Sequence, residues 1–349
     1  MAAFISFQPR DFFKTLLFTG TGSEQTITGL GFEPDFSWIK NRDITQSHYL
    51  ADSVRGLYVP DGATKTIYSN ASGSQDTNDN AQRDFNADGF VVGSEAGTNG
   101  SGNGMCSWSW KAGTTSGLSG GTITPSAYSI NTTSGFGIYQ YVGNGTAGAT
   151  IAHGLGVAPK FVICKKISNS GDWSVGFKDG ATFSKYLTLN NDDGANASSG
   201  YWNNTAPDAT NITFGDGHTN GSGITQIMYA WAPVRGYSAM GAYHGNGNED
   251  GPFVYTGFRP AYVIIKRYGA NGDTWGVWND KMLGYNPDNN SLHPESTAVQ
   301  GLGDYIDLLS NGFKPRNVAP AINGTSSYVY AAFAEFPIVS SNSKVGTAR

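Results

Sequence analysis

Charged residues are scarce in this chain of 349 residues, at 14% of the sequence, and the formal net charge is -5. The 22 lysines and arginines are scattered along the chain, whereas a nucleic-acid-binding face needs basic residues concentrated on one surface. No uncharged apolar run reaches the roughly 18 residues of a membrane-spanning helix. The opening residues, MAAFISFQPRDFF, lack the basic start and long apolar stretch of a secretory signal. We therefore expect no nucleic-acid partner, no membrane insertion and no signal peptide.

Cysteine is also rare. Cys106 and Cys164 each stand in an apolar, strand-like run, and we expect both to be reduced core thiols. The five histidines lie far apart in the sequence, in no ligand-like spacing. Segments 76–89 and 190–196 are rich in side-chain oxygens, but the first fails the register of a calcium-binding EF-hand loop. We expect no metal and no other cofactor, with a structural calcium ion in one of these loops as the open alternative.

Catalytic signatures are missing as well. The sequence has no G-x-S-x-G nucleophile motif. Residues 143–148, GNGTAG, match the dinucleotide fingerprint letter for letter, but a β-like run follows them instead of a helix, so they indicate a turn. Acidic pairs such as Glu249 with Asp250, or Asp304 with Asp307, leave glycoside hydrolysis open because their separation in space decides it. We predict that the protein is not an enzyme.

Glycine, in contrast, is abundant at 48 residues, and aromatic residues make up 13% of the chain. This usage is typical of short strands joined by tight turns. A phrase with a proline, an apolar run and a final lysine occurs three times: GFEPDFSWIK at 31–40, GVAPKFVICK at 156–165 and GFRPAYVIIK at 257–266. A glycine pair precedes each phrase (FTGTG, YVGNG, YHGNG), and an Asn-Gly pair followed by an aromatic run comes after it. Anchors repeated in one order indicate a triplicated unit.

The hydrophobic periodicity within each unit is two. In SYVYAAFAE, for example, Val329, Ala331 and Phe333 alternate with Tyr328 and Tyr330, which is the pattern of a half-buried antiparallel strand. The Asn-Gly pairs predict type I′ hairpin turns that feed these strands. Residues 45–55, TQSHYLADSVR, are the best helix candidate and a weak one. We predict an all-β fold of three tandem homologous antiparallel β-sandwich units, of jelly-roll or lectin-like type.

The domain boundaries follow from the anchors. We expect an N-terminal docking arm (1–12), repeats at 13–113, 135–234 and 239–338, a polar linker with one strand (114–134) and a polar tail (339–349). The arm carries apolar side chains that would make it a poor free tail in water: Phe4, Ile5, Phe7 and Phe12. We expect this arm to dock onto another subunit, with packing onto its own first unit as the alternative.

Ligand contacts are expected on loops, because loops on a rigid β-scaffold carry recognition. Most of the eight tryptophans lie in strand-like runs, where core packing explains them. The pair Tyr201 and Trp202, between polar runs, is the best candidate for an exposed aromatic surface. The loop 245–251, GNGNEDG, supplies the other candidates: Asn246, Asn248, Glu249 and Asp250.

Two stretches resemble a repeat of unknown function found in structural proteins of tailed bacteriophages, notably marine ones. They are GFEPDFSWIKNRD with SHYLADSVRG and SWSWKAG, and GNGNEDGPFVYTGFRPAYVIIK with IDLLSNGF. The resemblance covers about residues 13–338 and implies a virion location, a β-sandwich unit and no known catalytic residues. The second unit departs from the pattern at Val157 and Ala158, and the first unit lacks a counterpart of Trp173 and Trp275.

We therefore predict a virion structural protein, assembled in the cytoplasm of a bacterial host. A tail fibre or receptor-binding component, which displays β-sandwich modules to the host surface, is the favoured function. A capsid decoration or head-fibre protein bound to the shell is the alternative, and a polysaccharide depolymerase is a minor one. The expected partners are other virion proteins of the tail or capsid, further copies in a homo-oligomer, and a host-surface glycan or protein bound with avidity.

Overall fold

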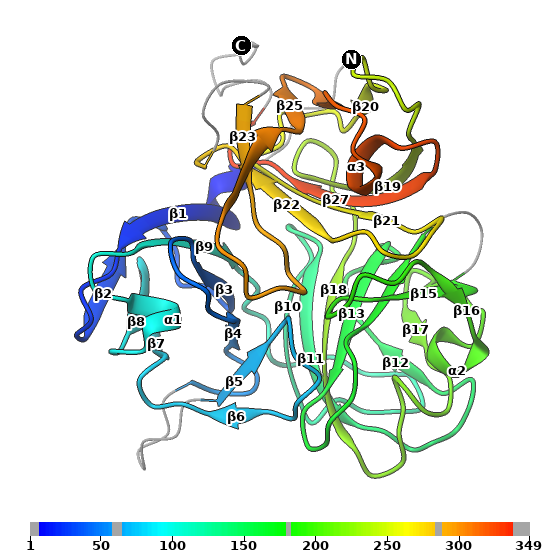
Figure 1. The fold of residues 1–349 in the computed structure, drawn as a ribbon. Helices are drawn as coiled ribbons and strands as arrows, with labels where there is room; N and C mark the ends of the chain where they lie inside the picture. Colours follow the sequence, from blue (N-terminus) through cyan, green and yellow to red (C-terminus); the bar gives the residue numbers. More distant parts are fainter. Residues whose placement is uncertain (1–6, 58–64, 179–182, 283–287, 338–349) are drawn as a thin grey trace.

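Strands dominate the computed structural model of this chain, which describes residues 7–57, 65–178, 183–282 and 288–337. The helices of the described residues are α1 (Ala96–Asn99), α2 (Ser199–Trp202), α3 (Pro320–Asn323) and the 3-10 turn η1 (Pro9–Asp11). The main strands pair antiparallel, so the all-β expectation is confirmed. Figure 1 shows the sheets in three groups around a common centre. We call them the first, second and third lobes (residues 13–113, 114–234 and 235–337).

The first lobe contains a main sheet of six strands in the order β1-β9-β3-β4-β5-β6. These strands are β1 (Phe13–Thr19), β9 (Gly104–Trp110), β3 (Phe36–Asn41), β4 (His48–Asp52), β5 (Lys65–Tyr68) and β6 (Asp76–Thr77). A small sheet of β2 (Gln25–Thr28), β8 (Gly89–Val92) and β7 (Gln82–Asn86) packs on the face that points away from the centre. The weak helix candidate at 45–55 is wrong, because its central residues form β4 and no helix is present there. Every residue of β4 is buried, so the strand shows no period of two.

The second lobe has the same strand order with one further strand at the edge. Its main sheet contains β10 (Ala127–Asn131), β11 (Phe136–Val142), β18 (Thr225–Trp231), β13 (Phe161–Lys166), β14 (Ser174–Phe177), β15 (Lys185–Thr188) and β16 (Asn196–Ala197), and its small sheet β12 (Thr150–Ala152) and β17 (Asn211–Thr213). Residues 114–134, expected as a linker with one strand, contribute β10 to this lobe, and Ile123 joins its core.

The main sheet of the third lobe has the order β19-β27-β21-β22. It contains β19 (Ser238–His244), β27 (Ser327–Phe333), β21 (Tyr262–Arg267) and β22 (Gly276–Asn279), and the small sheet contains β20 (Val254–Tyr255), β26 (Gly312–Pro315) and β25 (Ile306–Leu309). A bridge between Val277 and Leu292 extends the main sheet towards the pair β23 (Asp288–Ser291) and β24 (Gly301–Asp304).

The register of the central strands is the same in each main sheet. The last strand of each lobe (β9, β18 or β27) lies between the strand of the proline phrase (β3, β13 or β21) and, on its other side, β1, β11 or β19. Its aromatic end faces one residue on either side: Trp110 faces Phe13 and Phe36, Trp231 faces Phe136 and Phe161, and Phe333 faces Ser238 and Tyr262.

Alternating side chains of these strands fill two kinds of core. Residues on the centre-facing side, such as Trp110, Trp231 and Phe333, belong to one aromatic cluster shared by all three lobes. Their sequence neighbours on the other side, such as Ala230 and Ala332, belong to a separate cluster within their own lobe. A buried aromatic side chain removes roughly 150–250 Å² from water, so the shared cluster contributes strongly to holding the lobes together.

Main-chain hydrogen bonds join each lobe to the next in the same way. Between the first and second lobes, Gln75 N donates to Ile167 O (3.0 Å) and Gly171 N to Ser72 O (2.8 Å). Between the second and third lobes, Ala195 N donates to Tyr268 O (3.0 Å) and Gly272 N to Asp192 O (3.1 Å). Between the third and first lobes, Gln300 N donates to Arg42 O (2.9 Å) and Gln46 N to Thr297 O (3.0 Å). The third pair connects the third lobe back to the first, so the lobes form a closed ring. We call this last contact the closing junction.

The Asn-Gly pairs do not form the predicted type I′ turns. Such a turn needs positive φ at both residues, whereas φ is -56° at Gly100 and -64° at Gly324. Asn99 and Asn323 instead end short helices, and both side chains are fully buried. The buried asparagines hold the glycine pair of the same lobe: Thr21, Asn144 and Asn246 donate their main-chain N–H to Asn99, Asn220 and Asn323 Oδ1, at 2.8, 2.8 and 3.0 Å.

Close packing explains why the glycine pair and the Asn-Gly pair occur together. A Cβ atom at Gly20 would lie 2.3 Å from the carbonyl oxygen of Gly100. The corresponding distances are 2.3 Å from Gly143 to Gly221 and 2.2 Å from Gly245 to Gly324. Because no larger residue fits there, the two anchors found in the sequence are the two sides of one contact.

The N-terminal segment packs on its own chain where the structure describes it. The ring of Phe7 lies 5.1 Å from that of Phe12 and 5.7 Å from that of Tyr237, between centroids, and both phenylalanines contact the shared cluster. Phe7 and Phe12 therefore pack on the chain's own core, as in the alternative, and docking of this segment onto another subunit stays a prediction. Phe4 and Ile5 lie outside the described residues.

Candidate functional site

The loop 245–251 lies on the surface of the third lobe, where Asn246, Asn248, Glu249 and Asp250 are all exposed. Its own side chains order it: the Asn248 main-chain N–H donates to Asn246 Oδ1 at 3.0 Å, and that of Asp250 donates to Asn248 Oδ1 at 2.9 Å. Asn246 Nδ2 donates in turn to the Asp250 carbonyl at 2.9 Å. The loop therefore presents a fixed set of polar groups to solvent.

Lys314 of β26 and Arg316, which directly follows this strand, pair with this loop. Lys314 Nζ lies 2.5 Å from Asp250 Oδ1, and Arg316 Nη1 lies 3.3 Å from the same oxygen. The hydrogen bond from Lys314 is the main cause that lowers the pKa of Asp250. Arg316 also contacts Asp307, at 3.3 Å. Each of the two acidic pairs considered for glycoside hydrolysis therefore has one member in an ion pair: Asp250 with Lys314 and Arg316, and Asp307 with Arg316.

Tyr201 and Trp202 are not the exposed pair predicted from their polar surroundings. Both lie in α2 and are buried, with 7% and 0% of their surface exposed. The neighbouring polar residues cap this helix, since Ser198 accepts a hydrogen bond from the Gly200 N–H. Tyr201 lies flat between two rings, with centroid distances of 3.5 Å to Tyr186 and 3.9 Å to His218.

Three buried lysines lie beside the junctions between lobes. Lys40, Lys165 and Lys266 end the repeated phrases, and burial lowers the pKa of each to about 8. Lys40 Nζ donates to the Thr297 carbonyl at 3.1 Å, and Lys165 Nζ donates to the Ser72 carbonyl at 3.3 Å, both in a neighbouring lobe. The sequence analysis missed this role, although the recurrence of a lysine at the end of three apolar strands was its signal.

The residue that faces each of these lysines from the adjacent chain segment also lies at the boundary with the neighbouring lobe. In the second lobe Trp173 Nε1 donates to the Tyr68 carbonyl at 2.9 Å, and in the third Trp275 Nε1 donates to the Thr188 carbonyl at 2.9 Å. In the first lobe β4 places His48 opposite Lys40, so His48 replaces the missing tryptophan. Its Nδ1 accepts a hydrogen bond from Trp38 Nε1 at 2.8 Å.

Burial and the nearby charge of Lys40 lower the pKa of His48 well below its usual range, while the carbonyl of His293 opposes that shift. His48 and His293 are far apart in the sequence, but the closing junction brings them together. No spacing rule within one lobe finds this pair, because its members come from the first and third lobes.

The oxygen-rich segment 190–196 is part of a junction. Asn190 Oδ1 accepts the Trp173 main-chain N–H at 2.8 Å, and Gly194 N donates to Asn271 Oδ1 at 2.7 Å. In segment 76–89, Asn78 Nδ2 donates to Glu95 Oε2 at 2.8 Å. Across the described ranges, no group of three or more His, Cys, Asp or Glu side chains is placed to hold a metal ion. The same ranges contain no helix that is long and apolar enough to cross a membrane.

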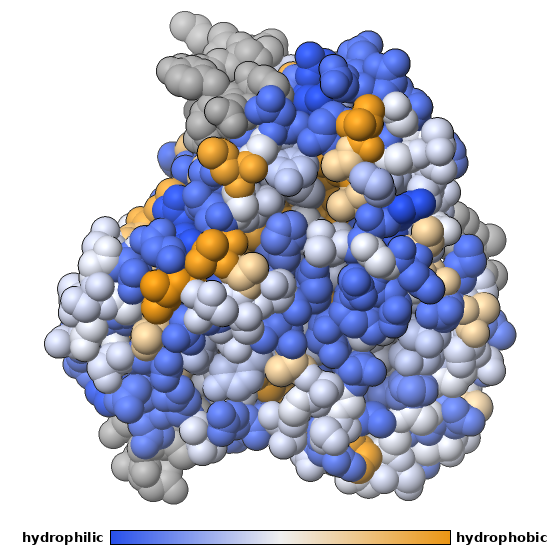
Figure 2. Space-filling view, viewed as in Figure 1, coloured by the Kyte–Doolittle hydropathy of each residue, from blue (hydrophilic) through white to orange (hydrophobic). Residues whose placement is uncertain are grey.

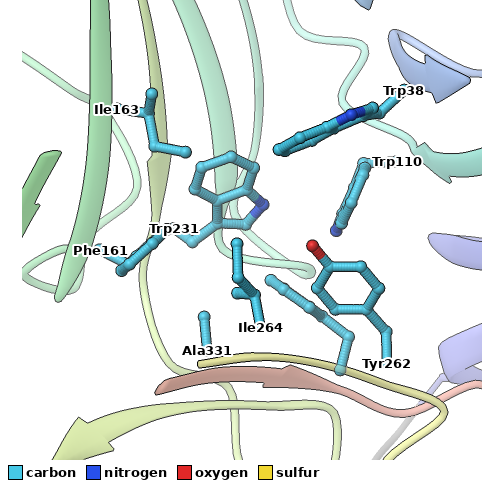
Figure 3. A pocket seen from close by; sticks show the side chains of 9 residues that line it. Trp38, Trp110, Phe161, Ile163, Trp231, Tyr262, Ile264 and Ala331 are labelled. Carbon is cyan, nitrogen blue, oxygen red and sulfur yellow. The ribbon is translucent and has the colours of Figure 1, made fainter. Parts of the chain in front are cut away.

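The shared aromatic cluster encloses a small cavity on the axis of the ring. Its walls come from all three lobes, with Trp38 and Trp110 facing Trp231, Phe161 and Tyr262 (Figure 3). The cavity measures about 10 Å³, the room of roughly one water molecule, and its lining is apolar. This centre is therefore a packed core rather than a ligand site.

Figure 2 shows a mostly hydrophilic face with hydrophobic residues in small spots. The second lobe also has an open groove of about 460 Å³ between the segments 118–121, 152–156 and 209–211, lined mainly by glycine and alanine. No curated protein and no solved structure matches this chain. Residues 8–337 match the family described as a domain of unknown function (DUF7483), and the chain therefore belongs to that family.

Proposed function

We propose that this protein is a structural component of a tailed-bacteriophage virion, of the tail-fibre or receptor-binding type. The observation that carries the proposal is the closed ring, in which three lobes share one aromatic core and equivalent main-chain junctions. Such a ring is a stiff platform, and stiff platforms with ordered polar loops are suited to display and recognition. The resemblance of the repeated phrases to virion structural proteins supports the same function.

The proposal includes homology of the three lobes as tandem β-sandwich modules. The equal strand order of the main sheets and the equal pairing of Trp110, Trp231 and Phe333 support it. The small sheets differ: the second lobe has α2 next to β17, whereas the first and third lobes have a third strand in the small sheet. We therefore propose that the lobes share a framework and differ in what they contact.

The proposed partners are other virion proteins and, at the loop 245–251, a host-surface glycan or protein. This loop combines exposed amides with the charged group of Asp250, Lys314 and Arg316. Amide and charged groups held in fixed positions are the hydrogen-bonding partners that sugar hydroxyls require. Assembly in the bacterial cytoplasm, the absence of a required cofactor and a non-enzymatic role complete the proposal.

The decisive test is the position of the protein in an intact particle. Antibodies raised against the purified chain should label the tail of the virus that encodes it in immunogold electron microscopy. Labelling of the capsid alone would favour the decoration or head-fibre alternative, and unlabelled particles that contain no such chain in mass spectrometry would refute the virion role. Release of reducing sugar from host polysaccharide by the purified chain would instead support the depolymerase alternative.

Receptor contact by the loop 245–251 needs a separate test. The purified chain should bind host cells, and Asn248→Ala with Glu249→Ala should weaken that binding several-fold, while Gly73→Ala on the first lobe should not. Equal binding of both variants would exclude this loop. Mass measurement in solution tests the proposed homo-oligomer, since a species of 37.0 kDa would show a monomer.

A further inference from the structure

The closing junction has a histidine at the position where the other two junctions have a tryptophan. It joins the first and third lobes, which the chain does not connect directly, so only non-covalent contacts hold it. Where the other junctions have Trp173 and Trp275, whose indole N–H groups donate to carbonyls of the neighbouring lobe, this one has His48. A histidine can change its charge near neutral pH, whereas a tryptophan cannot.

The surroundings of His48 accept only the neutral ring. Trp38 Nε1 donates to His48 Nδ1 at 2.8 Å, so Nδ1 must be an acceptor and the proton must be on Nε2. Nε2 is buried and, among the described residues, has no hydrogen-bond partner, while the carbonyl of His293 acts on the ring electrostatically. Protonation would turn Nδ1 into a donor that faces the donor of Trp38, and the hydrogen bond between them would be lost.

The groups around His48 do not compensate a positive charge. Lys40 on β3 and His293 on the loop after β23 act on it electrostatically, and neither is a carboxylate. Trp108 of β9 lies nearly parallel to the imidazole with centroids 6.4 Å apart. Asn70, after β5, accepts the main-chain N–H of His48 at 2.9 Å. Each packed element therefore offers His48 a neutral or basic group.

We propose that the closing junction is an acid-sensitive latch, in which protonation of His48 releases the first lobe from the third while the other two junctions stay closed. Release would separate aromatic pairs that meet across this interface, such as Trp108 with Tyr262 (5.4 Å) and Trp110 with Phe333 (5.5 Å). It would thereby expose part of the shared core. The inference depends on the ring and not on the proposed virion role.

The direction of the pH effect follows from the buried site. Burial holds the pKa of His48 well below its usual range, so an opened chain binds a proton that the closed ring does not. The closed form is fully favoured above about pH 6.5, the ordinary pKa of histidine, and loses ground as the pH falls below it. Each further pH unit shifts the opening equilibrium by up to about tenfold for one such group.

The other lobes supply a matched variant. On the strand of the proline phrase (β3, β13 or β21), Trp38 corresponds to Ile163 and Ile264. Opposite the lysine that ends this phrase, His48 corresponds to Trp173 and Trp275. At this site the first lobe has tryptophan on the strand and histidine opposite the lysine, whereas the other two lobes have isoleucine and tryptophan. The double variant Trp38→Ile with His48→Trp gives the closing junction the residues of the other two, and His48→Gln retains both an acceptor and a donor without a titratable group.

Hydrogen exchange at the three junctions tests the latch. For the full chain at pH 7.5 and 5.0, we compare protection, corrected for intrinsic exchange, in segments 42–46 and 297–300 of the closing junction and in segments 192–195 and 268–272 of a matched one. Protection of the closing junction should fall tenfold or more at pH 5.0, while the matched junction changes little. In His48→Gln and in the double variant this selective loss should disappear, and in the control His218→Gln, on the second lobe, it should remain.

Several outcomes would overturn the latch. Retained protection of the closing junction at pH 5.0 would show that the ring does not open. Equal loss at both junctions would show general acid unfolding. A selective loss that persists in His48→Gln would assign the effect to another group, with His293 the first to examine. If the double variant fails to fold, His48→Gln alone decides among these outcomes.

Discussion

Replacement of Tyr229 by phenylalanine should measure how strongly a buried polar network ties the second lobe to the first. Tyr229 Oη donates to Asp52 Oδ2 at 2.7 Å, and Arg55 Nε donates to the same oxygen at 2.5 Å. All three side chains are buried. A hydrogen bond to a charged group contributes about 1.5–3 kcal/mol to stability, and phenylalanine leaves almost no cavity. We therefore expect Tyr229→Phe to lower the free energy of unfolding by about 2 kcal/mol.

A double-mutant cycle makes this value specific. Asp52→Asn leaves the buried guanidinium of Arg55 without its counter-charge and should cost about 3–5 kcal/mol. Because Tyr229→Phe and Asp52→Asn disrupt the same contact, the double variant should cost about 1–2 kcal/mol less than the sum of the single ones. Urea denaturation followed by tryptophan fluorescence gives these differences from the shift in midpoint at an unchanged slope.

Tyr237 provides the matched control, because it is buried in the shared cluster and, among the described residues, its hydroxyl has no hydrogen-bond partner. Tyr237→Phe removes an unsatisfied polar atom and should leave stability unchanged or raise it. Equal losses for Tyr229→Phe and Tyr237→Phe would show that the polar network does not connect the lobes. A cycle with no coupling would lead to the same conclusion.

Three further predictions follow from the packing and from the lysines. Gly143→Ala should lower the free energy of unfolding by about 1–3 kcal/mol, because its Cβ would lie 2.3 Å from the Gly221 carbonyl oxygen. The control Gly73→Ala, with open space around the residue, should leave stability unchanged. Equal unfolding midpoints for the two variants would refute the close contact. Trp110→Ala should cost about 3–5 kcal/mol, and a melt near wild type would show that its side chain does not fill the core. The free energy of unfolding of the wild type relative to that of Lys165→Met should rise from pH 8 to 9.5, because the folded chain releases a proton from Lys165, whose pKa is about 8, while the unfolded chain keeps it; a difference that stays constant with pH would refute the assignment.

The sequence was informative where the fold depends on side-chain patterns within one repeat. The period of two in SYVYAAFAE separates the two faces of β27 correctly, with Val329, Ala331 and Phe333 in the shared cluster and Tyr328 and Tyr330 in the lobe's own core. The prediction of a half-buried strand is wrong, because both faces are buried. Two of the three anchors, the glycine pair and the Asn-Gly pair, were recognisable because a close main-chain contact requires glycine and a buried hydrogen bond uses asparagine.

Other features were not predictable because their determinants lie elsewhere. The ring is closed by main-chain atoms of loops whose side chains differ, such as Ser72, Asp192 and Thr297. The sequence therefore shows no common residue at these three positions that would predict the junctions. Tyr201 and Trp202 were misjudged because serine and asparagine beside them stabilise a short helix instead of indicating solvent exposure. His293, which acts on His48 electrostatically, comes from the third lobe.

Main-chain junctions have a consequence for how this architecture can diversify. Since the six connecting hydrogen bonds require no particular side chain, substitutions in these loops can alter the outer rim without dismantling the platform beneath it. A protein under pressure to recognise changing surfaces would gain from such a division, in which the invariant anchors are hidden and the variable positions face outward. Libraries randomised at the exposed residues 72–74, 192–193 and 297–299 would be the place to seek new binding specificities on an intact scaffold.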